Sequence, residues 1–227
     1  MKVTFVNSVN IARNIYKFSF QADKKPKHIA GQFIELYLPH ENKDNRGDKR
    51  WFTLSSSPTE EYLAITTKFA GENGSSFKKT LKNLAPGTEL NMASPMGDFV
   101  LPKDRSIPLV FVAGGIGCTP FHSITKYLID TGEKRDITLI YNANSPEDIA
   151  FKDDFDYYAE RFIQITGQRL TGQKILDLAG PSEKNRYFYL SGPEPMIENL
   201  QKELKNLGIN RKNIFTDFFP GYVIESI

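Results

Sequence analysis

The sequence predicts an antiparallel β domain followed by an α/β domain with a parallel sheet. In the first hundred residues, short alternations of apolar and polar residues are interrupted by turn residues, which is typical of a barrel or a sandwich. After Pro102, strands and helices alternate, as right-handed crossovers between parallel strands require. The segment 109–113 is continuously apolar, which indicates a strand buried on both faces.

The first domain is expected to contain several short strands and one helix. β-branched and aromatic residues are concentrated in the strand segments, and Pro and Gly clusters separate them. A helix is predicted over 76–84, with Ser75 as its cap. We expect strands at 3–6, 15–20, 33–38 and 62–67.

The second domain is expected to repeat strand and helix to the end of the chain. The change of pattern near 103–106 places the first domain at 1–103 and the second at 104–227. We expect helices at 120–129, 146–161, 173–178 and 194–207, and strands at 109–113, 137–141, 162–166, 187–190 and 213–218.

The composition excludes several classes of protein. Lys and Arg number 29 against 27 Asp and Glu, so the chain lacks the basic excess of a nucleic-acid binder. The single cysteine, Cys118, forms no intrachain disulfide and no iron–sulfur centre, and the three histidines lack ligand spacing, so no metal site is expected. The N-terminus does not resemble a signal peptide, and the most apolar run, 107–116, is too short to span a bilayer. We therefore expect a cytoplasmic protein without a membrane span.

A glycine-rich turn follows the apolar strand at 109–113. Gly114, Gly115 and Gly117 allow a sharp turn and close approach of a ligand. Thr119 is predicted to cap the next helix, and Pro120 suits its first position. Free amides at such a helix start attract a pyrophosphate, so this turn predicts dinucleotide binding. The alternative is an ordinary strand-to-helix turn.

Residues 50–56, Arg-Trp-Phe-Thr-Leu-Ser-Ser, resemble the flavin signature Arg-x-Tyr-Ser/Thr-x-x-Ser of the ferredoxin–NADP reductase superfamily. The resemblance covers nearly the whole chain and implies a flavin-binding Greek-key antiparallel β-barrel before a NAD(P)-binding α/β domain. It implies that Arg50 binds the flavin phosphate, that Phe52 stacks on the flavin, and that the catalytic Thr53 hydrogen-bonds flavin N5. Phe52 departs from the family's Tyr and lacks its hydroxyl. The neighbouring residues predicted to bind the cofactor are Trp51, Ser55 and Ser56.

Residues 71–78, Gly-Glu-Asn-Gly-Ser-Ser-Phe-Lys, resemble the family's glycine-rich loop for the flavin pyrophosphate. The resemblance implies that Gly74, Ser75 and Ser76 bind the cofactor and favours FAD over FMN. Ser75 and Ser76 compete for this role, and a plain helix cap is the alternative. Residues 94–99, Ser-Pro-Met-Gly-Asp-Phe, resemble the family's Gly-Pro-x-Gly-x-Phe turn, which we interpret as structural.

Residues 190–196, Leu-Ser-Gly-Pro-Glu-Pro-Met, resemble the family's Cys-Gly-Pro-x-x-Met, whose Cys lies beside the nicotinamide. Ser191 replaces that Cys and is the second predicted catalytic residue. Gly192 and Pro193 are predicted to contact the nucleotide. Residues 217–222 resemble the family's closing stretch, which implies that Phe219 covers the flavin; packing of the last strand is the alternative.

The resemblance implies hydride transfer from NADPH or NADH to bound FAD, then electron transfer to a separate acceptor. Ser145 and Arg169 favour NADPH, whereas acidic residues in the same loop, Glu147 and Asp148, oppose it. The acceptor stays open among a ferredoxin, a flavodoxin, free flavin and an oxygenase component. Three lysines on the predicted helix 76–84 are candidates for binding an acidic carrier: Lys78, Lys79 and Lys82. The alternative function is a non-catalytic flavin- or nucleotide-binding docking subunit, which Ser191 and Phe52 favour.

Overall fold

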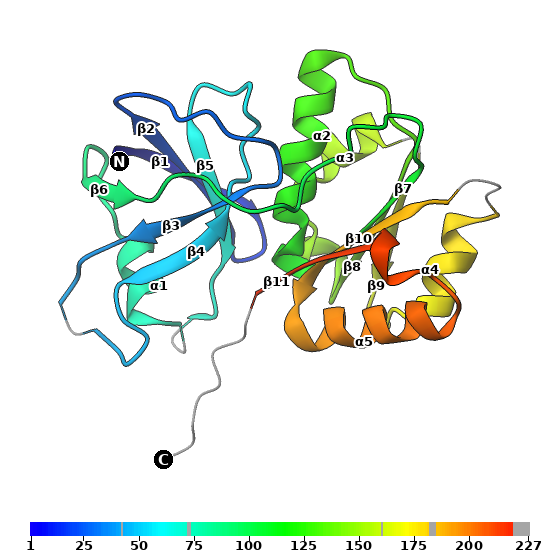
Figure 1. Ribbon diagram of the computed structural model, residues 1–227. Helices are drawn as coiled ribbons and strands as arrows, with labels where there is room; N and C mark the ends of the chain where they lie inside the picture. The colour runs from blue at the N-terminus through cyan, green and yellow to red at the C-terminus, as the bar shows by residue number, and fades with distance from the viewer. Residues whose placement is uncertain (42, 72–73, 160, 182–184, 220–227) are drawn as a thin grey trace.

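The computed structural model describes residues 1–227 except 42, 72–73, 160, 182–184 and 220–227. Two sheets of different kinds follow one another along the chain, and a long connection, residues 93–108, joins them (Figure 1). The predicted fold class, an antiparallel barrel and then a parallel α/β domain, is confirmed. The boundary predicted near 103–106 falls within the connection.

The first sheet is antiparallel and has the strand order β4-β3-β6-β1-β2-β5. A bridge between Leu54 and Ile65 joins its outer strands and closes the barrel. The connections from β2 to β3 and from β5 to β6 skip neighbours, as in a Greek key. Its elements are β1 (Lys2–Ala12), β2 (Ile15–Ala22), β3 (Phe33–Tyr37), β4 (Lys49–Thr53), β5 (Leu63–Lys68), α1 (Ser76–Lys82) and β6 (Glu89–Met92).

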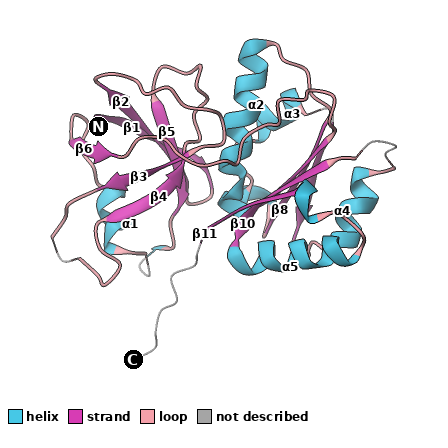
Figure 2. Cartoon of the chain, viewed as in Figure 1, coloured by secondary structure: helices cyan, strands magenta, loops and turns pink. Residues whose placement is uncertain are grey.

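The second sheet is parallel and has the order β11-β10-β7-β8-β9. Helices α2 and α3 pack on one face, and α4 and α5 on the other (Figure 2). Its strands are β7 (Leu109–Gly114), β8 (Ile137–Ala143), β9 (Arg161–Thr166), β10 (Tyr187–Pro193) and β11 (Ile214–Phe219). Its helices are α2 (Thr119–Thr131), α3 (Lys152–Tyr158), α4 (Gly172–Ala179) and α5 (Glu194–Asn206), with short 3₁₀ turns at Gly115–Cys118, Pro146–Asp148 and Arg211–Asn213.

Two sequence predictions of secondary structure are wrong. The helix expected over 146–161 is a 3₁₀ turn and a separate seven-residue helix, α3. Ile149 and Ala150 lie between them and are buried in the core, which pulls the chain out of helical geometry. Phe151 then adopts a left-handed backbone, with φ of 58°. Strands β4 and β6 have no counterpart among the expected strands, because the residues of β4 carry the flavin signature and the four residues of β6 carry too little periodicity.

The two domains share part of their apolar core. The cluster beneath α2 and α3 includes Ile15 from the barrel and Phe99 from the connection. In Figure 1, α2 lies between the barrel and the parallel sheet. This helix therefore contacts both domains, and it begins at the glycine turn predicted to bind a dinucleotide.

Candidate active site

The end of β4 meets the carboxyl ends of β10 and β11 at the junction of the domains. Thr53 is the last residue of β4, and Ser191 lies near the end of β10; both are buried. The Ser191 hydroxyl donates to the Asp217 carboxylate of β11, with an O–O distance of 3.3 Å. The Thr53 hydroxyl also hydrogen-bonds this carboxyl. The structure thus brings the two predicted catalytic residues together through a third side chain.

Asp217 is a site residue that the sequence prediction did not include. Burial raises the pKa of its carboxyl from 3.8 to about 6, against the hydrogen bonds from Ser191 and Thr53, which lower it. A carboxyl group with this pKa exchanges protons near neutral pH. The signal for Asp217 was present in the sequence, because it begins the closing stretch that resembles the family's and it follows a buried strand.

The residues of β4 divide between two faces. Arg50 and Phe52 point into the barrel and are buried, whereas Trp51 is 65% exposed and its indole N–H donates to Glu35. Phe52 packs against Phe77 of α1, with ring centroids 6.0 Å apart. Because successive side chains of a strand point to opposite faces, Trp51 and Phe52 cannot contact a ligand on the same face of β4. Trp51 lies on the same face of β4 as Thr53, and that face leads to the junction.

Three cationic side chains gather between β4 and α1. The Arg50 guanidinium lies 5.0 Å from the centroid of the Phe77 ring and donates to the carbonyl of Arg46. Lys78 donates to the Lys68 carbonyl at 2.8 Å. Burial, together with repulsion from Arg50 and Arg46, lowers the pKa of Lys78 to about 8. Lys78 therefore faces the barrel, which corrects the interpretation of this residue as an exposed contact for a carrier.

The two serines that compete for the loop at 71–78 have different partners. The Ser75 hydroxyl accepts from the backbone N–H of Lys78 and caps α1. The Ser76 hydroxyl contacts the His40 ring and accepts from the N–H of Asp44. Hydrogen bonds, chiefly from Arg46, hold the pKa of the Asp44 carboxyl well below its usual range. Gly74 stands before the cap, and its N–H donates to Gly71.

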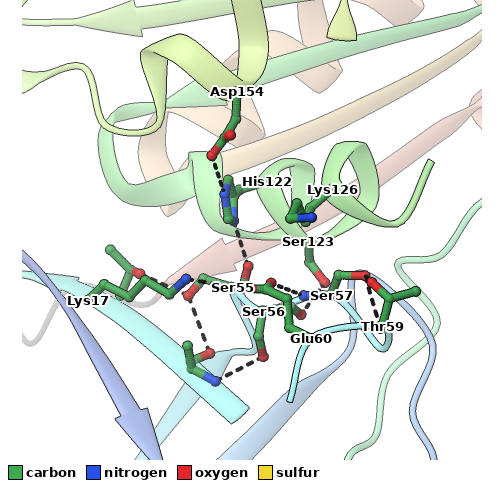
Figure 3. A network of polar contacts seen from close by, with 12 residues as sticks. Lys17, Ser55, Ser56, Ser57, Thr59, Glu60, His122, Ser123, Lys126 and Asp154 are labelled. Carbon is green, nitrogen blue, oxygen red and sulfur yellow. Dashed lines mark hydrogen bonds and ion pairs between the residues drawn. The ribbon is translucent and has the colours of Figure 1, made fainter. Parts of the chain in front are cut away.

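Ser55 and Ser56 are fully buried between the barrel and α2. The Ser55 hydroxyl lies 2.8 Å from the Thr66 hydroxyl, and the Ser56 hydroxyl accepts from the N–H of Ala64. Their side chains thus point into the barrel, and their carbonyls point to α2 (Figure 3). Their contact with the cofactor stays a prediction.

Two glycines of the turn, Gly114 and Gly117, are closely packed, and the third, Gly115, faces open space. A Cβ on Gly117 would lie 2.1 Å from the Ser191 carbonyl oxygen, and one on Gly114 would lie 2.6 Å from the Met196 sulfur. Gly115 has φ of +52° and open space on its side-chain side. Gly115 is thus the glycine of this turn that faces outward, whereas Gly114 and Gly117 allow β7 and β10 to approach.

Three further predicted positions complete this region. Gly192 lies against Gly114, where a Cβ would come within 3.0 Å of the Gly114 Cα. Pro193 ends β10 and occupies the cap position of α5. Thr119 is not a cap, which corrects the prediction: it is the first residue of α2, and its hydroxyl donates to the Ile116 carbonyl.

The expected closing aromatic lies at the limit of the described chain. The backbone of Phe219 ends β11 and pairs with Pro193. The Phe219 side chain and residues 220–222 lie outside the described residues.

The loop after β8, considered for nucleotide selection, contacts the barrel. Arg13 donates to the Ser145 hydroxyl at 2.7 Å and to both oxygens of Asp148. Lys68 also donates to Asp148, at 3.0 Å. The Arg13 hydrogen bond, opposed by burial, lowers the pKa of Asp148 to about 2. Ser145 is therefore part of a domain contact, whereas Arg169 is exposed and pairs with Glu203.

The described part of the chain offers neither an exposed cysteine nor a candidate metal site. Cys118 is buried, and burial raises the pKa of its thiol to about 12. Among residues 1–219 outside the gaps, no group of three or more His, Cys, Asp or Glu side chains is placed to hold a metal ion. No helix in those residues is long and apolar enough to cross a bilayer.

Comparison with known proteins gives related sequences over most of the chain. Residues 111–202 match the family described as "Oxidoreductase NAD-binding domain". The reductase subunit of stachydrine N-demethylase from Rhizobium meliloti is 27% identical over 93% of this chain and 65% of its own length. Flavohemoprotein A from Dictyostelium discoideum is 26% identical, over 93% and 58%. The chain thus spans about three fifths of the curated relatives it matches.

Solved structures share the fold over nearly the full chain. The FAD/NAD-binding domain of nitric oxide dioxygenase from Vibrio cholerae has a TM-score of 0.79 and 21% identity, covering 97% of this chain and 98% of that domain. The ferredoxin–NADP⁺ reductase from Plasmodium falciparum has a TM-score of 0.81 and 17% identity, covering 96% and 95%. Both likenesses concern the arrangement of the two domains described above.

Proposed function

This chain combines an oxidoreductase NAD-binding domain with the two-domain fold of the ferredoxin–NADP reductases, and we propose that it is an NAD(P)H-dependent flavoprotein reductase. It binds FAD on the barrel and a nicotinamide dinucleotide on the parallel sheet. FAD supplies the chemistry, by accepting a hydride and releasing electrons to a separate acceptor. The protein supplies the relative placement of donor and acceptor.

The observation that carries this proposal is the group of Thr53, Asp217 and Ser191, in which Thr53 and Ser191 are buried and Asp217 is half-buried. Thr53 comes from the barrel and the other two from the parallel sheet, so the group forms only where the domains meet. Its hydroxyls and its carboxyl can donate and accept hydrogen bonds at the site where hydride transfer would occur. The Asp217 carboxyl, with a pKa near 6, can hold a proton there at mildly acid pH.

The residues present fit a diphosphate-bearing flavin. The pKa of Lys78 is lowered chiefly by burial and further by repulsion from Arg50 and Arg46. An anion bound among them removes this repulsion and forms charge-assisted hydrogen bonds. This arrangement supports FAD over FMN, because the pyrophosphate of FAD offers more anionic oxygens to three cations.

The nucleotide is held by the edge where the parallel strands end. Gly115 faces outward in the turn after β7. Gly192 allows the end of β10 to lie close to Gly114 of the same turn. Ser191 replaces the family's Cys and keeps a hydrogen-bonding contact through Asp217. Ser145 is held by Arg13, so of the two residues that favour NADPH only Arg169, which is exposed and pairs loosely with Glu203, can turn to a 2′-phosphate. Both NADPH and NADH stay open as donors.

The acceptor is proposed at the level of a class. Two relatives are named as reductase subunits, one of stachydrine N-demethylase and one of glycine betaine monooxygenase. A separate oxygenase component is therefore the proposed partner, with a ferredoxin, a flavodoxin or free flavin as alternatives. We retain the cytoplasm as the expected location.

The test is the visible absorption spectrum of the purified protein with added FAD, before and after anaerobic NADPH and then NADH. Flavin bands that bleach with one nucleotide support the reductase and identify its donor. Flavin bands that neither nucleotide bleaches favour the second candidate, a non-catalytic docking subunit, which the replacement by Ser191 supports. A protein that takes up no FAD contradicts the reductase and favours a docking subunit that binds a nucleotide alone.

A further inference from the structure

Helix α2 links the two cofactor regions through the segment 55–57. The ring nitrogen Nδ1 of His122 lies 2.6 Å from the Ser55 carbonyl oxygen, and the Ser123 hydroxyl donates to the Ser56 carbonyl at 2.7 Å (Figure 3). Both side chains are buried. Ser55 follows Thr53 by two residues, and His122 follows the glycine turn by four. These two hydrogen bonds therefore join the segment after the proposed N5 contact to the helix that begins at the proposed nucleotide turn.

Both ring nitrogens of His122 face hydrogen-bond acceptors. Nε2 lies 2.9 Å from the Asp154 carboxylate of α3, while Nδ1 faces the Ser55 carbonyl. The Asp154 pKa is lowered, chiefly by the hydrogen bond from His122. The Ser55 carbonyl and the Asp154 carboxylate therefore fix the orientation of the His122 ring at the domain junction from two sides.

Other charged groups surround this pair. Lys17 of β2 and Lys126 of α2 each favour the ionised form of Asp154. Each of these lysines has its own acidic partner, Glu60 for Lys17 and Asp130 for Lys126. The lysines near Asp154 are therefore paired with acidic residues of their own.

Phe151 supports the ring from the other side. Its ring stacks on His122, with centroids 3.6 Å apart and planes inclined by 20°. This stack holds the plane of the ring. Phe151 takes this place with φ of 58°, a strained backbone conformation for a residue other than glycine. Such strain persists where the surrounding contacts fix the residue, here the stack on His122.

We propose that His122 and Ser123 are positioning residues for hydride transfer, holding the segment that follows Thr53 at a fixed distance from the nucleotide turn. The proposal rests on the proposed function and adds to it the element that sets the geometry between the domains. A displacement of about 1 Å between reacting groups can slow a reaction about a hundredfold. Loosening this contact therefore slows hydride transfer without removing either cofactor site.

The experiment compares Ser123→Ala with the matched control Thr125→Val. Thr125 is also buried in α2, but its hydroxyl donates to the His122 carbonyl within the helix and does not reach the barrel. Rapid-mixing measurements of flavin reduction at saturating nucleotide give the hydride-transfer rate. We expect Ser123→Ala to lower this rate about tenfold, with KM and FAD affinity unchanged, and Thr125→Val to leave it unchanged.

A second pair of variants, Asp154→Ala and Asp154→Asn, tests the support of the His122 ring. Asp154→Ala removes the contact at Nε2, so the Phe151 stack alone holds the ring against Ser55. The amide of Asp154→Asn can still hydrogen-bond Nε2. We expect Asp154→Ala to lower the hydride-transfer rate and the hydrogen-exchange protection of residues 54–57, and Asp154→Asn to retain both. Because Asp154 is half exposed, neither change disrupts the core.

The outcomes separate the two proposals. If neither nucleotide reduces the flavin of the unaltered protein, the proposed function fails, and the positioning role with it. If reduction is normal and Ser123→Ala matches Thr125→Val in rate and in exchange of residues 54–57, the positioning role alone is overturned. If Asp154→Ala and Asp154→Asn do not differ in rate or in exchange of residues 54–57, the contact between Asp154 and His122 has no positioning role.

Discussion

Replacing Asp217 by Asn is expected to stabilise the protein while slowing hydride transfer. Burial raises the pKa of this carboxyl from 3.8 to about 6, so the folded state binds the proton more tightly than the unfolded chain. Below pH 3.8 the carboxyl of Asp217 is protonated in both states and has no effect on the free energy of unfolding. As the pH rises to about 6, it lowers the free energy of unfolding increasingly. At about 1.4 kcal/mol per pH unit, the ionised carboxyl costs the fold about 3 kcal/mol above that range.

The measurement is the free energy of unfolding in urea for both proteins between pH 3.5 and 8. Other carboxyl groups, such as Asp148, contribute the opposite slope, but they contribute equally to both proteins and cancel in the difference. We expect the difference to be near zero at the acid end and to reach about 3 kcal/mol in favour of Asp217→Asn above about pH 6. A difference that does not change with pH would refute the reasoning.

Three further predictions follow from the described contacts. Lys78→Met is expected to weaken FAD binding about ten- to a hundredfold in a fluorescence titration, and to remove the loss of affinity above about pH 8 that the lysine's lowered pKa implies. Phe52→Ala is expected to lower the free energy of unfolding by about 3–5 kcal/mol, and Trp51→Ala by less than about 1 kcal/mol; equal losses would contradict the assignment of faces on β4. Gly117→Ala is expected to lower the melting temperature strongly, because its Cβ would meet the Ser191 carbonyl. Gly115→Ala is expected to impair nucleotide binding with a smaller loss of stability. A larger loss of stability in Gly115→Ala than in Gly117→Ala, measured by thermal unfolding beside a nucleotide titration, would contradict this prediction.

The parts of the site that depend on backbone chemistry were visible in the sequence. The glycine turn was predicted because glycines between an apolar strand and a helix have few other uses. The cap at Ser75 was among the predicted alternatives, and its hydroxyl accepts from Lys78. Local rules decide such features, since the interacting groups are separated by a few residues.

Features that depend on the direction of a side chain were not visible. The signature at 50–56 groups Trp51 with Phe52, but alternation along β4 sends them to opposite faces. Lys78 looks like a surface lysine in the sequence, yet α1 turns it toward Arg46 and Arg50. Thr119 was predicted to be a cap, but the 3₁₀ turn before it moved the helix start by one residue.

The sequence by itself determined the order of the domains, most strands of both sheets and the positions of the cofactor motifs, because these follow from periodicity and from turn residues within short windows. The tertiary structure alone decided how the domains meet. Asp217 joins Thr53 to Ser191 across 164 positions of the chain, and His122 reaches Ser55 across 67. Contacts at such separations depend on the packing of whole domains, which no local pattern records.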